Sequence, residues 1–147
     1  MVNKLKEKFP EVIFEEDESK AILIPSNIIL EICRFLKGSA GLEFDYMMNL
    51  AVVDLKDRLE IVYHLFSFTL RHKVTIKVRL ERQEPVLDSV SSVWRGADWF
   101  EREAYDMFGV RFNNHPDMRR ILLSDEWVGY PLRKDYTDPE LEVLPER

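Results

Sequence analysis

The sequence of 147 residues contains a single cysteine, Cys33. One thiol excludes an intrachain disulfide, an iron–sulfur cluster held by cysteines alone and a four-cysteine zinc site. No run of 18 apolar residues occurs, so the sequence offers no membrane-spanning helix. Its first residues are basic but lead into no apolar core, which is unlike a signal peptide. These absences predict a cytosolic protein.

An excess of basic residues is also absent. The chain has 21 Lys and Arg against 27 Asp and Glu, for a net charge of −6. This balance argues against a molecule covered by a phosphate-binding surface. The hydrophobic fraction of 46% is that of an ordinary globular domain, and a chain of this length buries enough surface to fold without a metal or disulfide.

The spacing of apolar residues predicts an α+β fold, with helices packed on a largely antiparallel sheet. The predicted order is helix, two strands, helix, three strands, helix, followed by an extended irregular C-terminal tail. We expect residues 1–109 to form the domain and residues 110–147 to form a tail that packs on it and on partner subunits. The predicted elements are a helix ending before Pro10, a hairpin over 12–15 and 21–24, a helix over 26–38, strands over 50–55, 59–68 and 73–80, and a helix over 93–108.

The last predicted helix has an unusual polar side that also carries aromatic residues. A solvated face with weak ion pairs is one interpretation of such a pattern. Tryptophan and tyrosine, however, are enriched at the centres of interfaces. Three rows of residues four apart run along this side: Asp98–Arg102–Asp106, Trp99–Glu103 and Glu101–Tyr105.

This helix and the chain after it resemble the C subunit of respiratory complex I, the 30 kDa subunit family of NADH–quinone oxidoreductase. The resemblance rests on WFEREAYDMFGV at 99–110, Phe112, HPDMRRIL at 115–122, Trp127, Gly129 and PLRKDY at 131–136. Met118, Ser124, Tyr130 and Asn114 depart from the usual leucine, proline, histidine and glycine. None of these departures removes a charged residue of the motif.

The resemblance implies a non-catalytic scaffold subunit of the peripheral arm, on the cytoplasmic side of the cell membrane. Such a subunit binds no cofactor itself, whereas FMN, iron–sulfur clusters and quinone belong to partner subunits. The implied partners are subunits D, B and I, and the membrane is reached only through the complex. The family signature and expected subunit interface comprise Trp99, Glu101, Arg102, Glu103, Tyr105, Asp106, Phe108, Gly109, His115, Pro116, Arg119, Arg120, Leu132, Arg133, Lys134 and Asp135.

Other functions remain open at this point. The homologous subunit of a membrane-bound hydrogenase, a formate hydrogenlyase or a deazaflavin-dependent dehydrogenase shares this module. A stand-alone enzyme would have to use Glu101 and Glu103, but two residues apart on a helix they point about 200° from each other. We expect Glu101, Arg102, Glu103 and Asp106 instead to fix the helix against the tail and a partner through charge-assisted hydrogen bonds.

The remaining candidate ligands have simpler interpretations. Residues 109–134 hold five Lys or Arg against three Asp or Glu, a local basic excess that suits a solvated loop or a docking site for a partner protein. No aromatic-interleaved motif accompanies it, so nucleic acid is not expected. We expect His64 to be a hydrogen-bonded core residue, His115 to anchor a turn rather than bind metal, and Cys33 to be a buried thiol.

Overall fold

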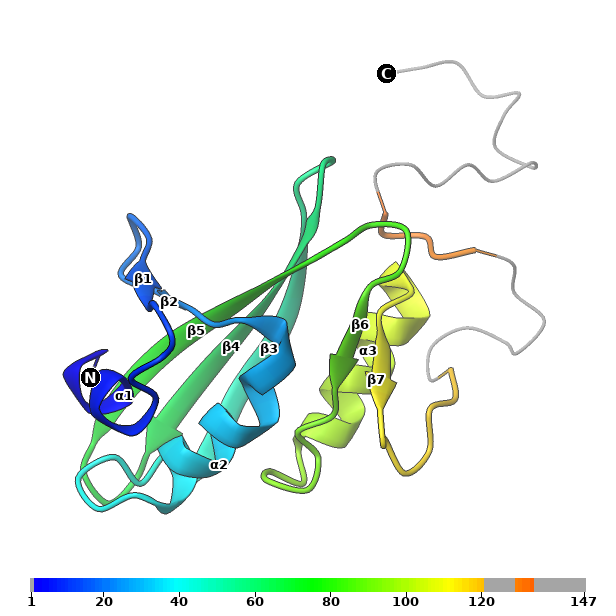
Figure 1. Ribbon diagram of the computed structural model, residues 1–147. Coiled ribbons are helices and arrows are strands. Elements are labelled where there is room, and N and C mark those ends of the chain that lie inside the picture. The colour runs from blue at the N-terminus through cyan, green and yellow to red at the C-terminus, as the bar shows by residue number, and fades with distance from the viewer. Residues whose placement is uncertain (1, 121–128, 134–147) are drawn as a thin grey trace.

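The computed structural model describes residues 2–120 and 129–133, and it confirms the α+β class (Figure 1). The helices are α1 (Val2–Lys8), a short 3-10 turn η1 (Ser26–Ile28), α2 (Ile29–Gly38) and α3 (Ala97–Phe108). The strands are β1 (Glu15–Glu16), β2 (Ile22–Leu23), β3 (Tyr46–Asp54), β4 (Leu59–Ser67), β5 (His72–Leu80), β6 (Val86–Asp88) and β7 (Arg111–Asn113).

Five strands form the main sheet in the order β1-β2-β5-β4-β3. All neighbours are antiparallel except β2 and β5, which are parallel. In β5 the residues Val74, Ile76, Val78 and Leu80 are buried and alternate with more exposed polar residues, as the sequence predicts. The β4 strand is paired on both sides and nearly all of it is buried, as its apolar centre over 61–63 and Leu65 predicts.

The apolar stripe of α2 packs on one face of this sheet, in front of it in Figure 1. Ile29, Ile32, Cys33 and Leu36 on that stripe are buried, so the expectation of a buried thiol is confirmed. In Figure 1, α3 lies at the β3 side of the sheet, with β6 and β7 beside it. The helix that carries the signature therefore stands at an edge of the sheet and not over its centre.

Two predictions about the chain around α3 were wrong. The helix begins at Ala97, not near residue 93, because residues 90–97 form successive turns in which the Trp94 indole donates to the carbonyl of Phe44 (2.9 Å). The chain after Gly109 is also not wholly irregular. It forms β7, which pairs in parallel with β6, the strand that precedes α3 in the sequence. Strands of three residues are too short to show alternation in the sequence.

The C-terminal end of α3 is set by Gly109. Its φ of 78° lies in the left-handed region, and its backbone N–H donates to the carbonyl of Tyr105 (2.9 Å). A Cβ atom at this position would lie only 2.7 Å from the ring of Tyr130. Both the backbone conformation and the close approach of Tyr130 therefore require glycine.

We predict that Gly109→Ala lowers the free energy of unfolding by about 2–4 kcal/mol, because it adds left-handed strain to overlap with Tyr130. Chemical denaturation of the full chain measures this loss. Gly96→Ala is the matched control, since Gly96 has a helical φ of −61° and an added Cβ meets nothing within 4 Å. Equal effects of the two substitutions would contradict the proposed role of Gly109.

Candidate functional site

The polar side of α3 binds the chain that follows β7. Residues 115–120, called here the 115–120 segment, contact each member of the Asp98–Arg102–Asp106 row. His115 Nε2 lies 2.9 Å from Asp98 Oδ1, and Arg102 Nε donates to the carbonyl of Arg119 (3.0 Å). Arg120 Nη1 donates to Asp106 Oδ1 (3.1 Å). The Asp98–Arg102–Asp106 row thus contacts the 115–120 segment along its whole length.

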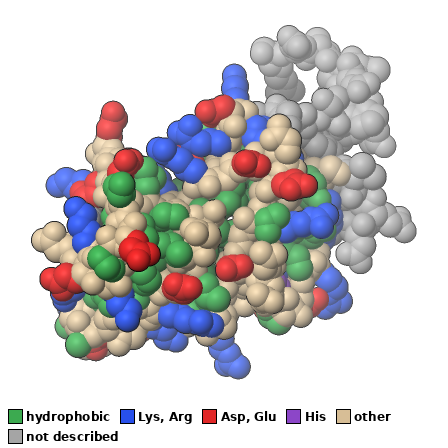
Figure 2. Space-filling model, viewed as in Figure 1, with side chains coloured by type: hydrophobic (Ala, Val, Ile, Leu, Met, Phe, Trp, Pro, Cys, Tyr) green, Lys and Arg blue, Asp and Glu red, His purple; other side chains and the backbone are tan. Residues whose placement is uncertain are grey.

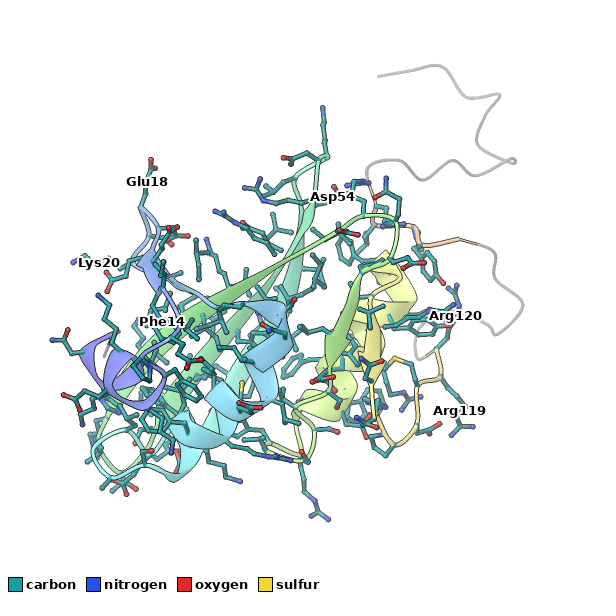
Figure 3. All side chains as sticks on the ribbon, in the orientation of Figure 1. Phe14, Glu18, Lys20, Asp54, Arg119 and Arg120 are labelled. Atoms are coloured by element: carbon teal, nitrogen blue, oxygen red, sulfur yellow. The ribbon has the colours of Figure 1, made fainter. Side chains whose placement is uncertain are left out.

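Arg120 is the centre of this arrangement, and Figure 3 labels it beside Arg119. Its side chain is 8% exposed and that of Asp106 is fully buried. Besides Asp106, the guanidinium donates to the carbonyl of Gly129 (3.0 Å) and lies over the ring of Tyr130 at 5.1 Å. A planar guanidinium with several fixed donors can bridge a helix and two chain segments in this way, which an ammonium group cannot.

The neighbouring Arg119 has a different environment. Its side chain is 71% exposed and forms a two-pronged ion pair with Asp117, with both N–O distances at 2.7 Å. This pair holds the pKa of Asp117 below its usual value. The two adjacent arginines of this basic segment therefore differ, with Arg120 buried at its side chain and Arg119 at the surface.

Glu101 points away from this row and into the protein. Its carboxylate accepts hydrogen bonds from the Ser89 hydroxyl (2.6 Å) and from the backbone N–H of Val90 (2.8 Å). Burial, aided by the negative charge of Asp98, raises its pKa from 4.5 to about 7, although these hydrogen bonds oppose the rise. Glu103 is exposed, so the two glutamates share no site and cannot act on one substrate.

His115 joins the segment to the start of α3. Its ring Nδ1 accepts a hydrogen bond from the backbone N–H of Asp117 (2.9 Å), and Nε2 contacts the backbone oxygen of Asp98 (3.3 Å). The imidazole is fully buried and lies 3.9 Å from Glu101 Oε1. It therefore anchors a turn, as expected from the sequence. His64, by comparison, lies 3.1 Å from the Thr75 hydroxyl in the sheet, also as expected.

The chain at 129–133 continues the same attachment. The backbone N–H of Leu132 donates to the carbonyl of Met107 (3.0 Å), and the Arg133 side chain donates to the carbonyl of Arg82. Arg82 in turn pairs with Asp54 at the end of β3. Lys134 and Asp135, also predicted as signature residues, lie outside the described residues, and Pro116 lies exposed in the turn after His115.

Apolar surface remains exposed beside this polar attachment. Trp99 is 60% exposed, with the Arg102 guanidinium 5.5 Å from its ring, and Leu132 is 57% exposed. A hollow of about 390 Å³ lies between β3 and α3; its apolar lining includes Leu50, Val52, Phe100, Phe108 and Leu132. In Figure 2 acidic and basic side chains are interspersed over the visible face, which shows no continuous basic surface.

Two contributors to the site carried no recognisable signal in the sequence. Ser89 accompanies Glu101 only because β6 brings it there, and Tyr130, noted above as a departure from histidine, packs against Gly109 and Arg120. The ring of Tyr105 also lies 6.0 Å from that of Tyr130. Tertiary structure, not spacing in the chain, creates these contacts.

In the part of the chain that the structure describes, no group of three or more His, Cys, Asp or Glu residues is arranged to hold a metal ion. Across residues 2–120 and 129–133, no helix is both long and apolar enough to cross a lipid bilayer. The chemistry of the described site is that of hydrogen bonds, ion pairs and apolar contact.

Proteins of similar sequence define the class to which this chain belongs. The chain is 42% identical to the C subunit of NADH-quinone oxidoreductase from Geobacter sulfurreducens, over 92% of this chain and 86% of that protein. It is 39% identical to the C subunit of F(420)H(2) dehydrogenase from Methanosarcina mazei, over 92% and 89%. Both relatives are subunits of larger enzymes.

Solved structures share the fold of this chain. A chain of the membrane-bound sulfane sulfur reductase, an archaeal respiratory membrane complex, matches 95% of this chain at 26% identity and a TM-score of 0.75, with 85% of that chain covered. A trypsin-resistant fragment of Nqo5 has the same fold at 24% identity and a TM-score of 0.65, covering 78% of this chain and 96% of the fragment.

The family described as "Respiratory-chain NADH dehydrogenase, 30 Kd subunit" matches residues 22–141. The chain belongs to this family, which confirms the resemblance seen in the sequence. As a member of a family of subunits it is a component of a hetero-oligomeric assembly.

We predict that folding stability depends on the ionisation of Glu101. Because its pKa is higher in the folded chain, the folded state binds the proton more tightly. The free energy of unfolding then falls by about 3 kcal/mol as the pH rises from about 4.5 to about 7. Denaturant titrations at several pH values measure this.

Glu101→Gln should remove this part of the pH dependence, since glutamine resembles the protonated acid. Glu103→Gln on the exposed side of the same helix should leave it in place. A wild-type profile that Glu101→Gln does not change would show that Glu101 does not carry the effect.

Proposed function

We propose that this chain is a non-catalytic scaffold subunit of the peripheral arm of proton-translocating NADH–quinone oxidoreductase. It binds no cofactor; FMN, iron–sulfur clusters and quinone belong to partner subunits. Its neighbours are subunits D, B and I, and it lies on the cytoplasmic side of the membrane, which it reaches through the complex. The resemblance of the signature and the identity of 42% to a C subunit of this enzyme support the proposal.

The observation that carries the proposal is how the charged residues of α3 are used. Asp98, Arg102 and Asp106 all hold the 115–120 segment, and Glu101 holds the residues after β6. These contacts are intramolecular and structural. They leave the described α3 region without a pair of acid and base groups converging on a substrate.

The exposed residues beside these contacts suit a protein partner. Trp99 and Leu132 offer apolar area, and the exposed carboxylate of Glu103 lines the same hollow between β3 and α3. Aromatic anchors surrounded by polar groups are typical of the centres of interfaces. We therefore assign this surface, together with the signature residues through Asp135, to contacts with neighbouring subunits.

A second candidate is the equivalent subunit of a deazaflavin-dependent dehydrogenase, which the identity of 39% to the C subunit of an F(420)H(2) dehydrogenase favours. Affinity purification of the tagged chain from its native membranes separates the two. Recovery of flavin- and NADH-binding subunits would support the first candidate. Recovery of a subunit that oxidises reduced deazaflavin would support the second, and a nickel–iron large subunit would indicate a hydrogenase.

We predict that Arg102→Glu lowers the yield of assembled complex about fivefold or more, because a carboxylate would face the carbonyl groups of Arg119 and Arg120. The turnover of each complex that does assemble should stay unchanged. Native gel electrophoresis of membranes, with activity normalised to complex, measures both quantities.

Arg34→Glu provides a control with the same change of charge, because Arg34 is an exposed residue of α2 away from this contact. It should assemble normally. Normal yield of the Arg102→Glu complex with slow turnover would contradict a purely structural role for α3.

A further inference from the structure

A buried group of two acids and one histidine joins three parts of the chain. We call Asp98, Glu101 and His115 the acid–histidine cluster. Asp98 and Glu101 lie on α3, His115 begins the 115–120 segment, and Glu101 also holds Ser89 and Val90 after β6. The side chains of Glu101 and His115 are buried, so the inference concerns contacts within this chain and holds whichever complex contains it.

The hydrogen bonds of His115 define where its proton lies. The backbone N–H of Asp117 donates to Nδ1, so in the neutral ring the hydrogen is on Nε2. That single N–H faces the backbone oxygen of Asp98 at 3.3 Å, the Asp98 carboxylate at 2.9 Å and Glu101 Oε1 at 3.9 Å. The N–H bonds the backbone oxygen of Asp98, so neither nearby carboxyl group receives a hydrogen bond from it.

Besides His115, the described groups that face Glu101 include no base. From α2 the Cys33 thiol faces it and from β4 the Tyr63 phenol, and both groups carry raised pKa values to which burial contributes most. From α3 comes the negative charge of Asp98, and the loop after β6 contributes the Ser89 hydroxyl. An ionised Glu101 in the closed cluster is thus opposed by burial and by Asp98.

We propose that docking of the 115–120 segment on α3 takes up one proton at the acid–histidine cluster, so that the segment closes as the pH falls and loosens as it rises. In the docked state His115 covers Glu101 and keeps water from it. When the segment lifts away, water reaches the carboxylate and the charged form is solvated again. Proton affinity is then higher in the docked state, and by linkage a proton favours docking.

The exposed position of Asp98 gives the cluster a route to solvent. The Asp98 side chain is 37% exposed, whereas Glu101 and His115 are fully buried. Protons can exchange at this edge without unfolding of the sheet. The device is therefore centred on the α3 attachment, where Glu101 also borders the core residues Cys33 and Tyr63.

Hydrogen–deuterium exchange of the full chain, with millisecond labelling, tests the proposal. The reporters are the backbone amides of Asp117 and Arg119, whose hydrogen bonds form a turn within the segment that its contacts with α3 hold in place. Their protection factors, corrected for intrinsic exchange, should fall about tenfold or more between about pH 6 and about pH 8.5. Amides of β4 should keep their protection across this range.

Two variants make the result specific. Glu101→Gln should give protection that no longer depends on pH, whereas the exposed control Glu103→Gln should behave as wild type. Should Glu101→Gln fail to fold, Asp98→Asn serves, because removal of its charge should shift the transition to lower pH.

Three results would overturn the proposal: a flat wild-type profile, parallel loss of protection in β4, or an Asp98→Asn transition at the wild-type pH.

Discussion

The buried ion pair between Arg120 and Asp106 is the contact on which the arrangement around α3 depends. Removing two charges from water is costly, and such a pair is stable only where other hydrogen bonds satisfy the remaining donors and lone pairs. Here the guanidinium also donates to the carbonyl groups of Asp106 and Gly129 and covers the Tyr130 ring. The Arg120 side chain therefore ties the path of the chain at 120 and at 129–130 to α3.

That path explains why the signature is so dense in charged residues. Asp98 and Arg102 extend the attachment toward the start of α3, and the Leu132 amide continues it at the other end. With the polar side of the helix occupied in this way, Trp99 and Leu132 remain as exposed apolar groups. Intramolecular ion pairing thus prepares the surface that we assign to the neighbouring subunits.

The sequence predicted the elements that are long enough to show a hydrophobic repeat. The alternation in β5 and the apolar stripe of α2 extend over nine or ten residues, and both elements are present. β6 and β7 were missed because three residues contain no period, and their pairing depends on the intervening α3. The beginning of α3 was misplaced because the Trp94 indole binds the Phe44 carbonyl, a tertiary contact without local signal.

The sequence predicted which residues make up the site, but it predicted less well which residues each side chain contacts. The row Asp98–Arg102–Asp106 identified the polar side of α3, but spacing alone could not show that Glu101 turns inward to Ser89 while Glu103 stays exposed. The family resemblance indicated which residues matter, and their burial in the structure shows that their roles differ. Arg119 and Arg120 are adjacent and identical in sequence, yet one lies at the surface and the other inside.

A double-mutant cycle between Asp106→Asn and Arg120→Met tests the central claim most directly. If the pair fixes the returning chain, the free energies of unfolding of the two single variants and the double variant should reveal a coupling of about 1.5 kcal/mol or more. Other contacts of either residue cancel in the cycle, so the coupling reports the pair itself. Additive losses would contradict the account and would mean that α3 and the chain after it are held together by something other than this ion pair.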